Sequence, residues 1–262
     1  MKFIITTHPT KKEAKKIKSE MKRWLTSNGH FMVSENQKAD LVIALGGDGF
    51  LIHTVGKYSQ KNIPCLGINA GNVGFLTSGN IFEWEKILEK LVRGNYKIEE
   101  RVGLELKIKD KKYGPFVNDI YLKHPTLMSS FIIKVNSEYV YKHLDGDGII
   151  VSTPTGSTGY NVSAGGPIIQ PGVFSLLLTP ICPSHLNIRS LVINPESKIE
   201  IETKGSRNLE PLYLVADGKT VSENINKNDL IMIKRHPKKL LFVILDKHHF
   251  YKALQKKKGL ME

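Results

Sequence analysis

Three glycines surround an aspartate in the first quarter of the chain. Gly46, Gly47, Asp48 and Gly49 follow directly on the apolar run 41–45. Glycines at the end of a buried strand let the backbone approach a ligand closely, and such turns commonly hold phosphate groups. A carboxylate repels phosphate, so Asp48 requires a chemical explanation of its own. Taken alone, Asp-Gly is also an ordinary turn pair.

Three further polar or glycine-rich stretches interrupt apolar segments: residues 69–76 (NAGNVGFL), the pair Asn118-Asp119, and residues 145–167. Each has a structural explanation by itself, namely a turn, a β-bulge or an irregular loop. The DGDG of residues 145–148 lacks the later ligands of a calcium loop. Several such stretches in one chain, two of them placed where strands of the first half end, favour a ligand site over separate turns.

The elements that position these stretches differ between the two halves of the chain. Up to about residue 98, short apolar strands (3–6, 41–45, 63–68) alternate with amphipathic helical segments (11–27, 50–58, 81–93). This alternation predicts an α/β domain with a parallel sheet over residues 1–98.

From about residue 99, runs such as LELKIK (104–109) and KIEIE (198–202) alternate with period two between turn residues. This pattern predicts a mostly antiparallel, β-sandwich-like domain over residues 99–239. We expect the C-terminal tail, about residues 240–262, to pack back on the first domain.

Composition narrows the possible partners. The net charge of +13 favours an anionic partner such as a nucleotide or polyphosphate, but the basic residues cluster near the two ends and are not interleaved with aromatic residues. We therefore expect no nucleic-acid partner, and no apolar stretch is long enough to cross a membrane. The two cysteines, Cys65 and Cys182, lie far apart in apolar contexts, which predicts buried free thiols and a cytoplasmic protein.

Together these motifs resemble those of the NAD kinases of the bacterial and archaeal type. The resemblance runs from residues 46–49 through 69–76, 118–119, 147–160 and 163–167 to 179–184 and 217–218, nearly the whole chain. The glycine-aspartate motif is shared with diacylglycerol and sphingosine kinases. The combination of TPTGST (153–158) with AGGP (164–167) is much more specific to NAD kinases.

The resemblance implies transfer of the terminal phosphoryl group of ATP or polyphosphate to the 2′-hydroxyl of the adenosine ribose of NAD, giving NADP. Asp48 is then the general base for that hydroxyl, which explains a carboxylate beside phosphate. It further implies a divalent cation, Mg²⁺, held mainly by the donor phosphates, with no protein metal ligand assigned. A homo-oligomer, dimer or tetramer, is expected on the same ground.

The substrate-binding residues implied by the resemblance are Gly46, Gly47, Gly49, His53, Phe75, Asn118, Asp119, Asp147, Thr158, Gly159, Tyr160, Asn161, Ser163 and Asp217. Asn118 and Asp119 are expected to bind the adenine or ribose of NAD, and Asp147 to face the nicotinamide end. Thr158, Gly159 and Tyr160 are expected to line the adenine pocket. His53 is either a pyrophosphate contact or a solvated helix residue, and Phe75 either packs on NAD or belongs to the core.

Four positions depart from the family pattern. Phe50 replaces a threonine, Asp119 a common glutamate and Gly159 a common alanine, and Asp145 stands where relatives often have a basic residue. Two alternatives therefore stay open: a lipid kinase that shares the first motif, and a nucleotide-binding sensor without turnover. Formation of NADP from NAD and ATP distinguishes the NAD kinase from both.

Overall fold

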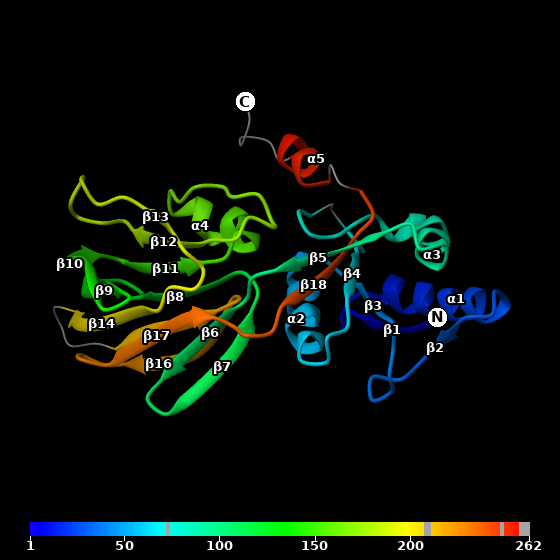
Figure 1. Ribbon diagram of the computed structural model, residues 1–262, viewed down its shortest axis with the longest axis horizontal. Coiled ribbons are helices and arrows are strands. Elements are labelled where there is room, and N and C mark those ends of the chain that lie inside the picture. Colours follow the sequence, from blue (N-terminus) through cyan, green and yellow to red (C-terminus); the bar gives the residue numbers. More distant parts are fainter. Residues whose placement is uncertain (72–73, 207–210, 247–248, 257–262) are drawn as a thin grey trace. The chain divides into compact units, whose positions relative to one another are not determined.

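The computed structural model describes residues 1–71, 74–206, 211–246 and 249–256 of the chain (Figure 1). It divides into two compact units, one formed by residues 1–100 and 240–262 and the other by residues 101–239. The C-terminal segment thus belongs to the same unit as the N-terminal one.

The first unit is built on a six-stranded sheet. In spatial order its strands are β2 (Phe31–Met32), β1 (Lys2–Thr7), β3 (Leu41–Leu45), β4 (Cys65–Ile68), β18 (Leu240–Ile244) and β5 (Lys97–Arg101). The pairs from β2 to β18 are parallel. All side chains of β3 and β4 are buried, as expected for central strands covered on both faces.

Helices α1 (Lys12–Ser27), α2 (Asp48–Ser59) and α3 (Trp84–Val92) follow strands of this sheet, and α5 (His249–Lys256) follows β18. α1 buries Ala14, Ile17, Met21 and Leu25, which recur at helical spacing. The segment expected to be one helix over 81–93 begins with a 3₁₀ turn, η1 (Ile81–Glu83). The reason is a capping box, in which Asn80 accepts from the Phe82 amide and Glu83 bonds back to the Asn80 amide.

The second unit is a sandwich of two antiparallel six-stranded sheets. One has the order β10 (Glu138–Gly146), β9 (Ser129–Val135), β14 (Ile199–Ser206), β17 (Leu230–Arg235), β6 (Leu104–Ile108) and β7 (Lys111–Phe116). The other has the order β13 (Leu191–Ile193), β12 (Leu176–Ile181), β11 (Gly148–Ser152), β8 (Asp119–Lys123), β15 (Leu212–Ala216) and β16 (Lys219–Ile225).

Alternation along the strands explains the sandwich. In β6 Leu104, Leu106 and Ile108 are buried, whereas Glu105 and Lys107 are partly exposed. The buried residues of both sheets form one core. The predicted fold class, a parallel α/β unit followed by a mostly antiparallel β unit, is confirmed.

Within the described ranges, none of the helices combines the length and the apolar character that crossing a bilayer requires.

Candidate active site

The glycine-aspartate motif lies where β3 gives way to α2. The Gly46 amide donates to the Ile68 carbonyl oxygen at 2.9 Å, and Gly47 is the N-cap residue that precedes α2. Asp48 therefore occupies the first turn of the helix, where the unpaired amides and the helix dipole stabilise a negative charge. The carboxylate and the turn glycines face the same end of the sheet as the end of β4.

The Asp48 carboxylate joins this motif to the segment after β4. Its Oδ2 accepts the Phe75 amide at 2.7 Å, and its Oδ1 accepts the amides of Leu76 and Thr77, each at 3.2 Å. Gly74 packs so closely that a β-carbon there would overlap the carboxylate. Two motifs about 27 residues apart are thus brought together by one side chain.

The Phe50 side chain packs against Gly46 in the glycine turn. A β-carbon on Gly46 would come within 2.7 Å of the Phe50 ring, and the ring also meets His8 edge-on with centroids 5.5 Å apart. The aromatic residue at this position thus packs over Gly46 and against the N-terminal strand's end. His53 is exposed on the same helix, whereas the Phe75 side chain is 6% exposed, so a ligand meets little of its ring in this conformation.

In the second unit, Asn118 and Asp119 stand at the start of β8, held by Asp217. The Asp217 carboxylate accepts the amides of Val117 and Asn118, both at 2.7 Å, and of Asp119 at 3.3 Å. Asp217 lies in the turn between β15 and β16 with a left-handed φ of 46°, a conformation that Asp and Asn tolerate better than most residues.

Asp119 and Asp217 form a buried carboxyl pair. Asp119 is 5% exposed, and burial together with the Asp217 charge raises its pKa to about 7. Burial also raises the pKa of Asp217, although the three backbone amides oppose that shift because they stabilise the ionised form. Asp119 therefore titrates near neutral pH, well above the range of an ordinary aspartate.

The TPTGST motif lies against the segment that carries Asn118 and Asp119. The motif forms η2 (Thr155–Thr158), and Gly159 and α4 (Tyr160–Ser163) follow. A β-carbon on Gly159 would lie 3.8 Å from both Asn118 Nδ2 and Asp119 Oδ2, so these motifs share one site. Thr158 is partly buried there.

Tyr160 packs edge-to-face on Tyr121, with ring centroids 4.9 Å apart. Burial, and then the nearby Cys182, Asp147 and Asp119, raise the pKa of Tyr160. The two half-buried rings provide an aromatic surface beside the carboxyl pair.

Asn161 and Ser163, both predicted as substrate contacts, differ in burial. Asn161 is fully buried, and its Nδ2 donates to the carbonyl oxygens of Ser157 (3.1 Å) and Pro167 (2.9 Å). Its Oδ1 accepts the Thr179 hydroxyl at 2.6 Å. These bonds engage both amide protons internally, whereas Ser163 is exposed.

Asp147 is exposed between β10 and β11, next to Cys182. The expectation that both cysteines are buried is correct for Cys65 and wrong for Cys182. The reason is that Cys182 follows the end of β12 with a left-handed φ of 44°, which turns the chain outward and places the thiol beside the Asp147 carboxylate.

Four residues that contact the predicted site residues were not themselves among the predicted substrate contacts: Gly74, Tyr121, Thr153 and Gly156. A β-carbon on Gly156 would overlap the Asn118 carbonyl group, and Thr153 bonds to the backbone of Val117. Period-two alternation from Asp119 would have placed Tyr121 on the same face of β8. Sequence alone carries no comparable signal for the contacts of Gly156, because its neighbour is about 38 positions away.

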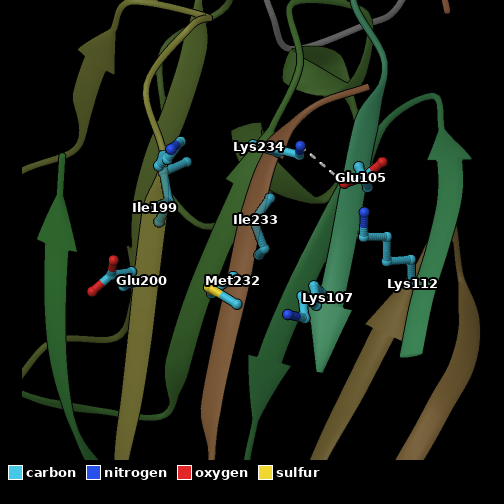
Figure 2. A pocket seen from close by; sticks show the side chains of 9 residues that line it. Glu105, Lys107, Lys112, Ile199, Glu200, Met232, Ile233 and Lys234 are labelled. Atoms are coloured by element: carbon cyan, nitrogen blue, oxygen red, sulfur yellow. Dashed lines mark ion pairs between the residues drawn. The ribbon is translucent and has the colours of Figure 1, made fainter. Parts of the chain in front are cut away.

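The second unit also has a hollow of about 230 Å³ on the outer face of the sheet that contains β6 and β17 (Figure 2). Lysines and glutamates line it, including Lys234, which forms an ion pair with Glu105 at 3.3 Å. None of the predicted site residues lines this hollow, so it is separate from the site around Asp119.

Comparisons with known proteins agree with these features. Residues 30–96 match the family model described as the ATP-NAD kinase N-terminal domain, and residues 118–245 match the ATP-NAD kinase C-terminal domain. Over 241 residues the chain is 35% identical to an NAD kinase of Caldicellulosiruptor saccharolyticus, covering 92% of this chain and 90% of that protein.

Two solved structures are similar in fold. An NAD kinase from Archaeoglobus fulgidus in complex with ATP has a TM-score of 0.76 and 26% identity, covering 97% of this chain and 98% of that one. Yeast NADH kinase complexed with NADH has a TM-score of 0.87 at 23% identity, covering 100% and 88% of the respective chains.

Proposed function

Because this chain belongs to the NAD kinase family, we propose that its two units divide the work of transferring a phosphoryl group to NAD. The chain is an enzyme that phosphorylates NAD to NADP. In our proposal the first unit supplies Asp48 as general base together with the phosphate-facing turn of Gly46, Gly47 and Gly49. The second unit holds NAD.

One observation carries the role of Asp48. Its carboxylate is held rigidly by three amides, yet Oδ2 accepts only one of them and keeps a lone pair for another donor. In the reaction the 2′-hydroxyl of NAD donates to that oxygen. As the new bond from the ribose oxygen to phosphorus forms, the proton passes to Asp48 and the bond to the donor's leaving phosphate breaks.

The NAD-binding role of the second unit is supported by an unsatisfied polar atom. Among the described residues, Asn118 Oδ1 is buried and has no hydrogen-bond partner, which carries a cost unless a ligand donates to it. An adenine amino group or a ribose hydroxyl is such a donor. Asp119 lies next to it, and Tyr160 and Tyr121 offer an apolar surface for the base.

The remaining predicted substrate contacts are assigned to the region of Asp48 or to the region of Asn118. Asp147 and Ser163 are exposed and available for the nicotinamide end or a neighbouring subunit, and His53 is exposed beside the phosphate-facing turn. Asn161 acts indirectly, by fixing the turn that carries Tyr160. Phe75 contributes through its backbone amide to Asp48 and otherwise belongs to the core.

We propose Mg²⁺ as the divalent cation. Among the described residues, no group of three or more His, Cys, Asp or Glu side chains gathers as a cage for a metal ion. A magnesium ion needs few protein ligands when phosphates and waters complete its shell, so we assign it no protein ligand and expect the donor phosphates to hold it. Bound there, the ion would neutralise charge on the transferred phosphoryl group.

We also propose a homo-oligomer in the cytoplasm. Both substrates are metabolites of that compartment, and the free cysteines are consistent with reducing surroundings. Light scattering on the purified protein measures its assembly, and a monomer at micromolar concentration would contradict the first part.

The test of the proposed function is an assay of the purified protein with NAD, Mg²⁺ and either ATP or polyphosphate. We expect NADP to form with at least one donor. A parallel reaction with diacylglycerol and ATP tests the lipid-kinase alternative. NAD binding without NADP formation from any donor, with NAD or NADH as acceptor, would establish a sensor and overturn the kinase.

A further inference from the structure

The Asp217 carboxylate accepts hydrogen bonds from backbone amides of a neighbouring strand. It accepts the N–H groups of three successive residues, 117, 118 and 119, across the start of β8. The Asp217 amide in turn donates to the Asp119 carbonyl oxygen at 3.0 Å. Three of the roughly four lone-pair positions of this carboxylate are therefore used within the protein.

The same short segment is held from its other side by Thr153. The Thr153 hydroxyl donates to the Val117 carbonyl oxygen at 2.6 Å, and the Thr153 amide donates to the Asn118 carbonyl oxygen at 2.8 Å. Both the amides and the carbonyls around Asn118 thus have defined partners. The backbone that carries the Asn118 side chain has little freedom to rotate.

Placing an aspartate at position 217 lowers the stability of the folded protein, and a turn without a buried carboxyl would avoid this cost. Asp217 lies next to the buried carboxyl of Asp119, and burial of two neighbouring carboxyls is unfavourable. An asparagine tolerates the same left-handed turn without that charge. The aspartate differs from asparagine in that both of its oxygens can accept, which is what three converging amides require.

We infer that Asp217 is a positioning residue that acts on NAD binding through Asn118, and that it does not contact NAD itself. The two shortest bonds of its carboxylate come from the amides of Val117 and Asn118 and thereby fix the backbone that carries the Asn118 side chain, whose buried Oδ1 lacks a partner among the described residues. The inference rests on the proposed function, because it takes Asn118 as a contact to NAD.

The first experiment compares Asp217→Ala and Asp217→Asn with the wild type. Asn keeps the turn and one accepting oxygen but directs an amino group at one of the amides. We expect the KM for NAD to rise about tenfold or more for Asp217→Ala and less for Asp217→Asn, since small displacements of a binding group are costly. The KM for ATP is expected to stay unchanged.

The matched control is Asp229→Asn. Asp229 also accepts a backbone amide in a turn of the second unit, that of Asn226 at 2.9 Å, but no predicted site residue depends on it. We expect it to leave both KM values unchanged. A common rise in both KM values for the Asp217 variants, or an equal effect of the control, would show a merely structural role and overturn the inference.

A double-mutant cycle tests whether the effect passes through Asn118. NAD affinity is measured by calorimetry for Asp217→Asn, Asn118→Ala and the double variant. We expect Asp217→Asn to weaken NAD binding several-fold when Asn118 is present and much less when it is combined with Asn118→Ala. Equal fold-changes in both backgrounds would mean that Asp217 acts independently of Asn118.

The two hypotheses fail in distinguishable ways. If the wild type forms no NADP but binds NAD, the kinase fails while the cycle can still be measured. If the wild type is active and Asp217→Asn binds NAD normally, only the positioning role fails. Should Asp217→Ala not fold, Asp217→Asn alone carries the comparison.

Discussion

At the scale of single residues, two aspartates of this chain accept backbone amides in the same way but lie in different surroundings. Asp48 and Asp217 each accept three successive backbone amides. Asp48 lies at the start of a helix beside a glycine turn that leaves room for phosphates, whereas Asp217 lies in a hairpin turn. Because the surroundings differ, we propose the role of base for Asp48 alone and a positioning role for Asp217.

The first prediction concerns Asp48→Asn. An amide cannot take the hydroxyl proton, so we expect kcat to fall by about 100-fold or more. NAD affinity, measured by calorimetry without donor, is expected to be largely retained because we propose that the second unit holds NAD. An unaffected rate of NADP formation would remove Asp48 from the role of base.

The control for this variant is Asp40→Asn in the same unit. Asp40 accepts the Lys2 amide at 2.7 Å, so it loses a comparable bond without touching a motif. We expect a wild-type kcat for this control. A similar loss of kcat in both variants would point to damaged folding of the unit instead of a lost base.

At the scale of elements, the segment after β4 sets the position of Asp48. It supplies the three amides, and Gly74 leaves the space that the carboxylate occupies. Only a residue without a β-carbon permits this approach. The position of the Asp48 carboxylate therefore depends on how the segment after β4 packs against the end of β3.

The second prediction is that Gly74→Ala lowers kcat by about tenfold or more, because the new methyl group displaces the carboxylate. Gly71→Ala in the same segment is the matched control. A β-carbon there would lie 3.6 Å from Asn69 Oδ1 and 3.9 Å from Lys11 Nζ, which are ordinary contacts. Steady-state rates of NADP formation compare the two, and equal rates would contradict the argument.

At the scale of the whole molecule, the buried carboxyl pair makes stability depend on pH. The pKa of Asp119 rises from 3.8 to about 7 on folding, so the folded protein binds this proton more tightly than the unfolded chain does. Folding thus takes up a proton between these two values. It follows that the free energy of unfolding decreases as pH rises from about 4 to about 7, and levels off above.

The third prediction is that Asp119→Asn weakens this dependence. Urea unfolding followed by circular dichroism at pH 5 and pH 8 measures it. From pH 5 to pH 8, we expect the free energy of unfolding of the wild type to fall by more than about 1 kcal/mol further than that of Asp119→Asn. One unit of pKa corresponds to about that energy.

The control for the pH measurement is Asp110→Asn, an exposed aspartate of the same unit. Its replacement is expected to leave the pH dependence of the wild type intact. The same pH dependence in the wild type and in Asp119→Asn would contradict the idea that this carboxyl takes up the proton.

The order of the elements and the location of the chemistry follow from the sequence. The α/β alternation and the period-two strands are local patterns, because side-chain burial repeats with the geometry of a helix or a strand. The glycines at strand ends and the TPTGST motif are likewise contiguous, and it is their resemblance to the NAD kinase motifs that predicts the activity. The bounds of the helix expected over 81–93 were less accurate, because a local capping box competes with the helix at its start.

Only the tertiary structure decided what each polar side chain does. Asp217 and the amide of Val117 lie 100 positions apart, and Thr179 and Asn161 lie 18 apart, so no spacing in the sequence predicts that they meet. The same limit explains why Cys182 was wrongly expected to be buried and why Phe50 is seen to pack on Gly46 only in the fold. Chain-local patterns determine which elements form, whereas a hydrogen bond or a close approach depends on which distant segments the packing brings together.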